Sequence, residues 1–71
     1  MTGQIQDIRT GFAEAFDAEI RRRALTNEEM ARLLDTNERQ VRRWRHGTNE
    51  PSLRTYRHIR AVLGWNGEAA A

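Results

Sequence analysis

Residues 25–47 read LTNEEMARLLDTNERQVRRWRHG, and this stretch decides the fold. Thr26 followed three residues later by Glu29 is a capping box, the pattern that begins a helix. The polar run at 35–37 is typical of a turn, and its asparagine is a good cap for a further helix. Gly47 is the expected stop signal of that helix. The stretch therefore predicts two short helices joined by a tight turn, the second over residues 38–46.

An apolar stripe precedes this stretch. Its members recur every three or four residues, the spacing of one helix face: Ile5, Ile8, Phe12, Phe16 and Ile20. Gly11 interrupts the stripe and costs about 1 kcal/mol in a helix interior, so a shorter helix capped by Thr10 is the alternative. Three arginines follow at 21–23, where cations favour the negative end of the helix dipole, and we interpret them as capping this helix.

A fourth helix is predicted between Ser52, as its cap, and Gly64, as its stop signal. Its inward residues are expected to be Leu53, Tyr56, Ile59 and Leu63. Trp65 is expected to fold back as the apolar contact that accompanies a glycine stop. The predicted fold class is all-α, with one domain over residues 10–65. Residues 1–9 are an N-terminal extension or first helical turn, and residues 66–71 are a flexible tail.

The composition excludes several classes of protein. A chain of 71 residues is one domain, and without cysteine it has no disulfide and no thiolate metal ligand. It has no apolar run near the ~20 residues of a membrane span and no visible secretory signal, so we expect a cytoplasmic protein. His46 and His58 fall on different helices, and we expect no metal or other cofactor. No catalytic Ser-His-Asp set or Gly-rich phosphate loop is present, so we exclude an enzyme and expect no small-molecule ligand.

The charge is unevenly distributed. Residues 1–20 hold one arginine and four acidic side chains, residues 64–71 add one acidic side chain, and residues 21–63 hold eleven arginines against five acidic side chains. The middle of the chain is therefore strongly basic. All twelve basic residues are arginine, whose planar guanidinium matches phosphate and the edge of guanine. A solvated surface rich in arginine is the alternative, and the positions of the arginines have to decide.

The helix predicted at 38–46 separates its residues by type. Projection at about 100° per residue puts Val41 and Trp44 on one side, which predicts that both pack in the core. The other side carries, within an arc of about 100°, four basic residues: Arg39, Arg42, Arg43 and His46. Glu38 lies at the edge of this arc, where the positive end of the helix dipole favours a carboxylate. Such a face repels itself, and a polyanion would relieve the repulsion.

These residues resemble the lambda-repressor and Cro type of helix-turn-helix regulator. The likeness covers residues 12–64 without a gap, and its features are the run LTNEEMARLL at 25–34 with its small Ala31, then Val41, Trp44 and Gly47, and the run EPSL at 50–53. At the turn, Asp35 stands where the family has glycine, and Thr36 stands where it has an apolar residue. The resemblance implies a small all-α domain of four to five helices, whose recognition helix lies in the DNA major groove.

The resemblance also implies roles for individual residues. Positions that face base edges in the family are occupied by Glu38, Arg39, Arg42 and Arg43. Positions expected to contact the DNA backbone are those of Asn27, Asn37, His46, Thr48, Asn49 and Arg54. Three outward arginines favour sites that contain guanine, because bidentate contact to its O6 and N7 is the commonest specific pairing.

We therefore expect a transcriptional regulator, more readily a repressor than an activator, that binds a double-stranded operator as a homodimer with half-sites about 34 Å apart. Dimerisation only on DNA remains open. Leu33, Val62 and Trp65 are candidates for an exposed apolar dimer surface, with partial burial of Leu33 against the first helix as the alternative. The alternative function is an antitoxin or phage inhibitor that binds an acidic protein. Only DNA binding combines a steep salt dependence with base preference.

Overall fold

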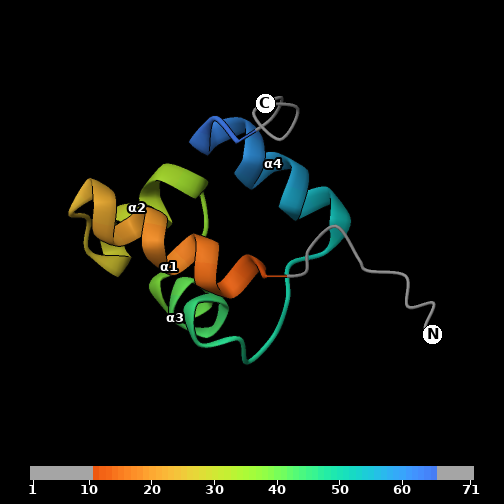
Figure 1. Cartoon of the computed structure of the whole chain (residues 1–71), viewed down its shortest axis with the longest axis horizontal. Coiled ribbons are helices and arrows are strands. Elements are labelled where there is room, and N and C mark those ends of the chain that lie inside the picture. Colours follow the sequence, from red (N-terminus) through yellow and green to blue (C-terminus); the bar gives the residue numbers. More distant parts are fainter. Residues whose placement is uncertain (1–10, 66–71) are drawn as a thin grey trace.

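Four α-helices make up most of residues 11–65, the part of the chain that the computed structural model describes (Figure 1). They are α1 (Phe12–Arg23), α2 (Asn27–Leu34), α3 (Glu38–His46) and α4 (Leu53–Leu63). These residues include no strand, so the all-α prediction is confirmed. The segments predicted as an N-terminal extension (1–9) and a flexible tail (66–71) lie outside the described residues.

The first helix is shorter than the apolar stripe predicts. It begins at Phe12, and Gly11 is its N-cap with φ 80°, a left-handed conformation that glycine adopts without a steric penalty. The N-cap of α1 is thus Gly11, while Thr10, the alternative cap, lies outside the described residues. A helix running through Gly11 is wrong, because the backbone there is not helical. The part of the stripe at Ile5 and Ile8 lies outside the described residues.

All four helices of residues 11–65 end in the same conformation. The residue after each helix is left-handed, with φ between 58° and 76°, and these residues are Ala24, Asp35, Gly47 and Gly64. The following N–H group then bonds back to a carbonyl five residues earlier, as from Thr36 to Ala31 at 2.8 Å. This is the Schellman arrangement, which satisfies carbonyl groups that a helix end leaves unpaired. The predicted stop signals at the two glycines are confirmed.

The end of α4 also shows the predicted return of Trp65. Its N–H group donates to the carbonyl of Arg60 at 2.8 Å, and its ring meets that of Phe12 edge to face at 6.2 Å between centroids. Trp65 is half-buried against the core. The apolar contact that accompanies the glycine stop is therefore present.

The core is built from one face of each helix. Its buried members are Phe12, Phe16, Ile20, Met30, Ala31, Leu34, Val41, Trp44, Ile59 and Leu63. α3 packs against both α1 and α2, whereas α4 packs mainly against α2. In Figure 1, α3 and α4 lie on opposite sides of α1. Because both helices turn their apolar residues toward one core, their outer faces look in different directions.

Leu53 corrects the predicted inner stripe of α4. It is 44% exposed, whereas Ile59 and Leu63 are buried. At about 100° per residue, Leu53 projects about 80° from Leu63 and about 120° from Ile59, outside their shared face. Tyr56 is half-buried, and its ring meets the ring of Phe12 edge to face at 5.9 Å. The buried stripe of α4 therefore begins one turn later than predicted.

Candidate functional site

Local hydrogen bonds fix where α2 and α3 begin and end. Thr26 Oγ1 accepts from the N–H of Glu29 at 3.0 Å, and Glu29 Oε1 accepts from the N–H of Thr26 at 2.8 Å. Asn37 Oδ1 accepts from the N–H of Gln40 at 2.8 Å and so caps α3. The predicted capping box and the predicted second cap are therefore confirmed. Asp35 makes the turn between the two helices in a left-handed conformation.

Two buried residues hold α3 against the rest of the domain. Val41 and Trp44 are both in the core, as their phase on the helix predicts. The indole of Trp44 meets the rings of Phe12 and Phe16 edge to face, at 6.3 and 5.9 Å between centroids. Such contacts with α1 restrict rotation of α3 about its own axis. Trp44 Nε1 is buried and has no hydrogen-bond partner within residues 11–65.

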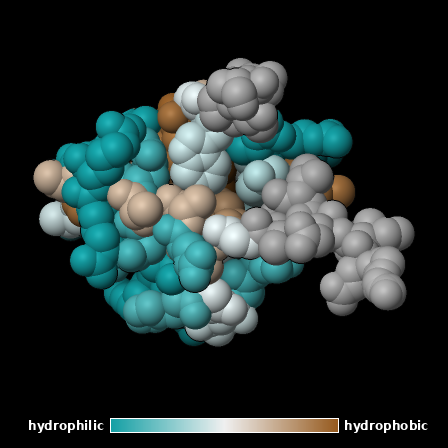
Figure 2. Space-filling view, in the orientation of Figure 1, coloured by the Kyte–Doolittle hydropathy of each residue, from teal (hydrophilic) through white to brown (hydrophobic). Residues whose placement is uncertain are grey.

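The outer side of α3 forms what we call the arginine face, made of Arg39, Arg42, Arg43 and His46, which are all exposed. Arg42 pairs with Glu38 one turn earlier, at 3.2 Å between Nη2 and Oε2. An exposed pair of this kind contributes only about 0.3–0.5 kcal/mol, so a ligand can displace it. Among the described residues no carboxylate lies within ion-pair distance of Arg39 or Arg43. Hydrophilic residues cover most of the surface drawn in Figure 2, where α3 lies at the lower edge.

Arg45 is the arginine of α3 that sequence reasoning missed. Its side chain is only 20% exposed, and its Nε donates to Asp17 Oδ1 on α1 at 2.7 Å. Its Nη1 donates to Asn27 Oδ1 on α2, also at 2.7 Å. A signal was present, because Arg45 projects only about 40° from Val41 on the helix. The identity of its two partners depends on how three helices cross.

Asp17 is held between two guanidinium groups. Arg21 Nε donates to Asp17 Oδ2 at 2.7 Å, while Arg45 occupies Oδ1. The hydrogen bond from Arg21 and then that from Arg45 lower the pKa of Asp17 below its ordinary value of 3.8. This carboxylate therefore stays ionised at neutral pH and keeps Arg45 turned inward.

Five of the six residues predicted to contact a DNA backbone lie at the two ends of α3 and at the start of α2, and the sixth, Arg54, lies at the start of α4. Asn27 is the first residue of α2 and is half-buried, with its carbonyl oxygen facing Arg45. Asn37 uses its carbonyl oxygen to cap α3. His46, Thr48 and Asn49 follow one another in and after the last turn of α3 and are exposed. Asn49 Nδ2 donates to Gln40 Oε1 at 3.4 Å, which ties this loop to α3.

Arg54 lies across a groove from α3. The groove has a volume of about 420 Å³ and runs between the α2–α3 turn and the first half of α4. Its lining includes Asp35, Gln40, Arg54 and His58, together with apolar atoms of the core. Arg54 is exposed, so a partner that contacts the start of α4 and the α2–α3 turn would meet its guanidinium.

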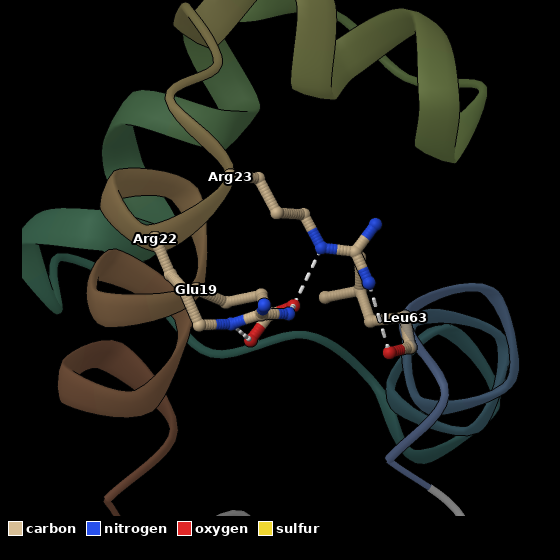
Figure 3. Close-up of polar contacts among 4 residues, drawn as sticks. All are labelled: Glu19, Arg22, Arg23 and Leu63. Carbon is tan, nitrogen blue, oxygen red and sulfur yellow. Dashed lines mark hydrogen bonds and ion pairs between the residues drawn. The ribbon is translucent and has the colours of Figure 1, made fainter.

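A second polar cluster joins α1 to the end of α4 (Figure 3). The side chain of Glu19 is only 10% exposed and accepts from Arg22 Nη2 and Arg23 Nε, both at 2.5 Å. The bond from Arg22 is the largest influence, and together with that from Arg23 it outweighs burial, so the pKa of Glu19 lies below its usual 4.5. Arg23 also donates through Nη2 to the carbonyl of Leu63 at 3.1 Å. Beyond the capping role we gave residues 21–23, Arg23 thus satisfies the end of α4.

The three candidates for a dimer surface, Leu33, Val62 and Trp65, differ in how exposed they are. Leu33 is 45% exposed, so part of its side chain is free and part is covered. Val62 and Trp65 are half-buried and pack against the core. Relative to its size, Leu33 is therefore the most exposed of the three.

Other kinds of site have little support in residues 11–65. No group of three His, Asp or Glu side chains there is placed to hold a metal ion. The helices in this part of the chain are too short and too polar to cross a bilayer. A comparison with known protein families, curated proteins and solved structures finds no match to this chain.

Proposed function

We propose that this protein is a sequence-specific regulator that binds double-stranded DNA by laying α3 in the major groove. The observation that carries the proposal is the arginine face. Val41 and Trp44 hold one side of α3 in the core, and the opposite side presents three guanidinium groups to solvent. A helix fits the major groove, and guanidinium groups are the commonest specific partners of guanine there. The resemblance of α2, the turn and α3 to helix-turn-helix regulators supports the same reading.

In this proposal the four residues of the first turns of α3 read bases, and those around them contact the backbone. The base readers are Glu38, Arg39, Arg42 and Arg43. Because Glu38 pairs with Arg42, it can direct that guanidinium as well as contact a base. The backbone contacts are Asn27, Asn37, His46, Thr48, Asn49 and Arg54. The side-chain oxygens (Oδ1) of Asn27 and Asn37 both accept hydrogen bonds within the protein. The side-chain NH₂ groups of the two asparagines are therefore left as donors for phosphate.

The proposal extends to a homodimer on a two-fold operator. Two copies of α3 would enter successive major grooves about 34 Å apart, so half-sites would be one helical turn apart. Leu33 supplies exposed apolar surface for self-association, which could form only on DNA. Such a protein would act in the cytoplasm on nucleoid DNA, and it would repress transcription by occupying promoter DNA.

The proposal is tested by selecting bound duplexes from a random pool, which reports the site, its symmetry and the half-site spacing together. On the selected duplex, Arg43→Ala should cost about 1–3 kcal/mol, with a smaller loss on unrelated DNA. Arg57→Ala is the matched control, because it removes the same charge from an exposed position on α4. This control should weaken binding to both duplexes slightly and equally.

Two results would contradict the proposal. An equal loss on both duplexes would make Arg43 a phosphate contact and not a base reader. A pool that returns no preferred sequence would favour the alternative function, a helical module such as an antitoxin or phage inhibitor that binds an acidic protein.

Salt dependence is a further expectation of the proposal. The logarithm of duplex affinity should fall with the logarithm of salt concentration, by about 0.9 per phosphate neutralised.

A further inference from the structure

Arg45 joins the three helices on which the proposed interface is built. Its guanidinium contacts Asp17 on α1 through Nε and Nη2, at 2.7 and 2.5 Å, and Asn27 on α2 through Nη1 at 2.7 Å. It thus differs from the arginines of the arginine face, which point outward from the same helix. Each of its three nitrogens makes one inward contact, and its side chain is only 20% exposed. Arg45 therefore offers DNA little direct contact, and its partners are the groups through which it can act.

The chemistry of the contact with Asn27 sets the orientation of the asparagine. A guanidinium carries hydrogen-bond donors and no acceptor, so the carboxamide atom that faces it has to be the oxygen. The amino group of Asn27 is then directed away from Arg45. None of the described residues accepts a hydrogen bond from this amino group, and its two N–H groups stay available. Were the carboxamide reversed, two sets of donors would face each other.

We infer that Arg45 is a positioning residue, which holds the Asn27 carboxamide with its amino group toward a DNA phosphate. The inference rests on the proposed function and specifies how one of its backbone contacts is prepared. A carboxamide that rotates freely would present its oxygen to phosphate part of the time, and that orientation is repulsive. The contact with Asp17 fixes the guanidinium from the other side, because Arg21 holds the second oxygen of that carboxylate. The contacts of Arg45 with Asp17 and Asn27 also fix the spacing between Asn27 and the arginine face.

The sharpest test is Asn27→Asp, measured on the duplex that the wild-type chain selects. Aspartate has nearly the same shape and still accepts from Arg45, so the fold is retained. It has no N–H donor, however, and it turns a negative charge toward the phosphate. Because a hydrogen bond to a charged group contributes about 1.5–3 kcal/mol, duplex affinity should fall by about 10- to 100-fold. The thermal unfolding midpoint should equal or exceed that of the wild type.

A double-mutant cycle then tests whether Arg45 acts through Asn27. Arg45→Lys keeps the charge, but a single ammonium lacks the fork that spans Asp17 and Asn27, so duplex affinity should fall several-fold. In an Asn27→Ala background the same substitution should cause almost no further loss. A purely structural role of Arg45 would give the same loss in both backgrounds. Circular dichroism of each variant establishes that it is folded.

The outcomes separate this inference from the proposed function. If the wild-type chain selects a duplex and Asn27→Asp binds it as tightly, the Asn27 amino group does not face phosphate and the inference is overturned. Equal losses from Arg45→Lys in both backgrounds also overturn it, while the proposed function stands. A wild-type chain that retains no duplex overturns both. Weak binding by the folded Asn27→Asp variant, together with a non-additive cycle, supports both.

Discussion

Two exposed alanines, one within α1 and one just after it, allow the substitution Ala→Gly to be tested in two backbone conformations. Ala18 lies in the middle of α1 with its side chain exposed, and Ala24 follows the last turn of the same helix, also exposed. Ala24 is left-handed, with φ 58° and ψ 41°, and its N–H group donates to the carbonyl of Arg21 at 3.0 Å. We predict that Ala→Gly stabilises the domain at position 24 and destabilises it at position 18.

The magnitudes follow from the backbone alone, because neither methyl group is buried. A left-handed conformation costs an L-residue about 1–2 kcal/mol, and glycine escapes most of this cost, so Ala24→Gly should add about 1 kcal/mol to the free energy of unfolding. In a helix interior glycine is about 1 kcal/mol worse than alanine, so Ala18→Gly should subtract that amount. Each kcal/mol moves the thermal midpoint of a domain of this size by about 4–8 °C, in opposite directions for the two variants.

Thermal and urea unfolding followed by circular dichroism at 222 nm, a wavelength that reports helix content, would measure both changes. Gly64→Ala is the reciprocal control. Gly64 has φ 76°, and an added Cβ would meet no atom within 4 Å, so any loss there reflects strain in the backbone. The reasoning is refuted if Ala24→Gly lowers the midpoint as Ala18→Gly does, because Ala24 would then not be left-handed. Duplex binding should be unchanged in all three variants, since none alters the arginine face.

Two further predictions concern the helix cap of α2 and the two carboxylates that pair with arginine, Asp17 and Glu19. Thr26→Ala removes half of the capping box of α2 and should cost about 1 kcal/mol in urea unfolding, whereas a loss within experimental error would show that the cap is not formed. The pKa values of Asp17 and Glu19 are lower in the folded chain than their ordinary values of 3.8 and 4.5. The ion pairs of these carboxylates therefore contribute fully to the free energy of unfolding above the ordinary pKa values. The contribution is lost as the pH falls through the pKa values of the folded chain. The urea midpoint should therefore begin to drop as the pH falls below about 5 and should continue to drop through the folded pKa values. Asp17→Asn should show a smaller drop over the same range. An equal drop would exclude Asp17 as a cause.

Much of the proposed interface could be predicted because its signals are local. The capping box at Thr26 and the glycine at position 47 concern hydrogen bonds within a few residues of each other, and such bonds form in the same way in any protein. The exposure of the arginine face follows from helical periodicity once Val41 and Trp44 are buried. The pairing of Glu38 with Arg42 is also local, since the two are one turn apart.

Contacts between distant residues could not be predicted in the same way. Arg45 meets Asp17 across 28 residues, and Arg23 meets Leu63 across 40. The sequence contains many other acceptors for these arginines, and only the crossing of the helices brings a particular one within reach. Leu53 is a different case, because its phase relative to Ile59 and Leu63 already puts it outside their shared face, and helical periodicity alone indicates that it is exposed.

By itself, the sequence determined where the helices of residues 11–65 stop, which side of α3 is apolar, and that the middle of the chain is basic. Each of these depends on neighbours within one or two helical turns. The tertiary structure alone decided which arginines are free and which are used internally, so that Arg45 turns inward to Asn27 while Arg39 and Arg43 remain exposed. The physical reason is that a guanidinium pairs with whichever acceptor the packing of apolar faces brings within about 3 Å, and that packing is a property of the whole domain.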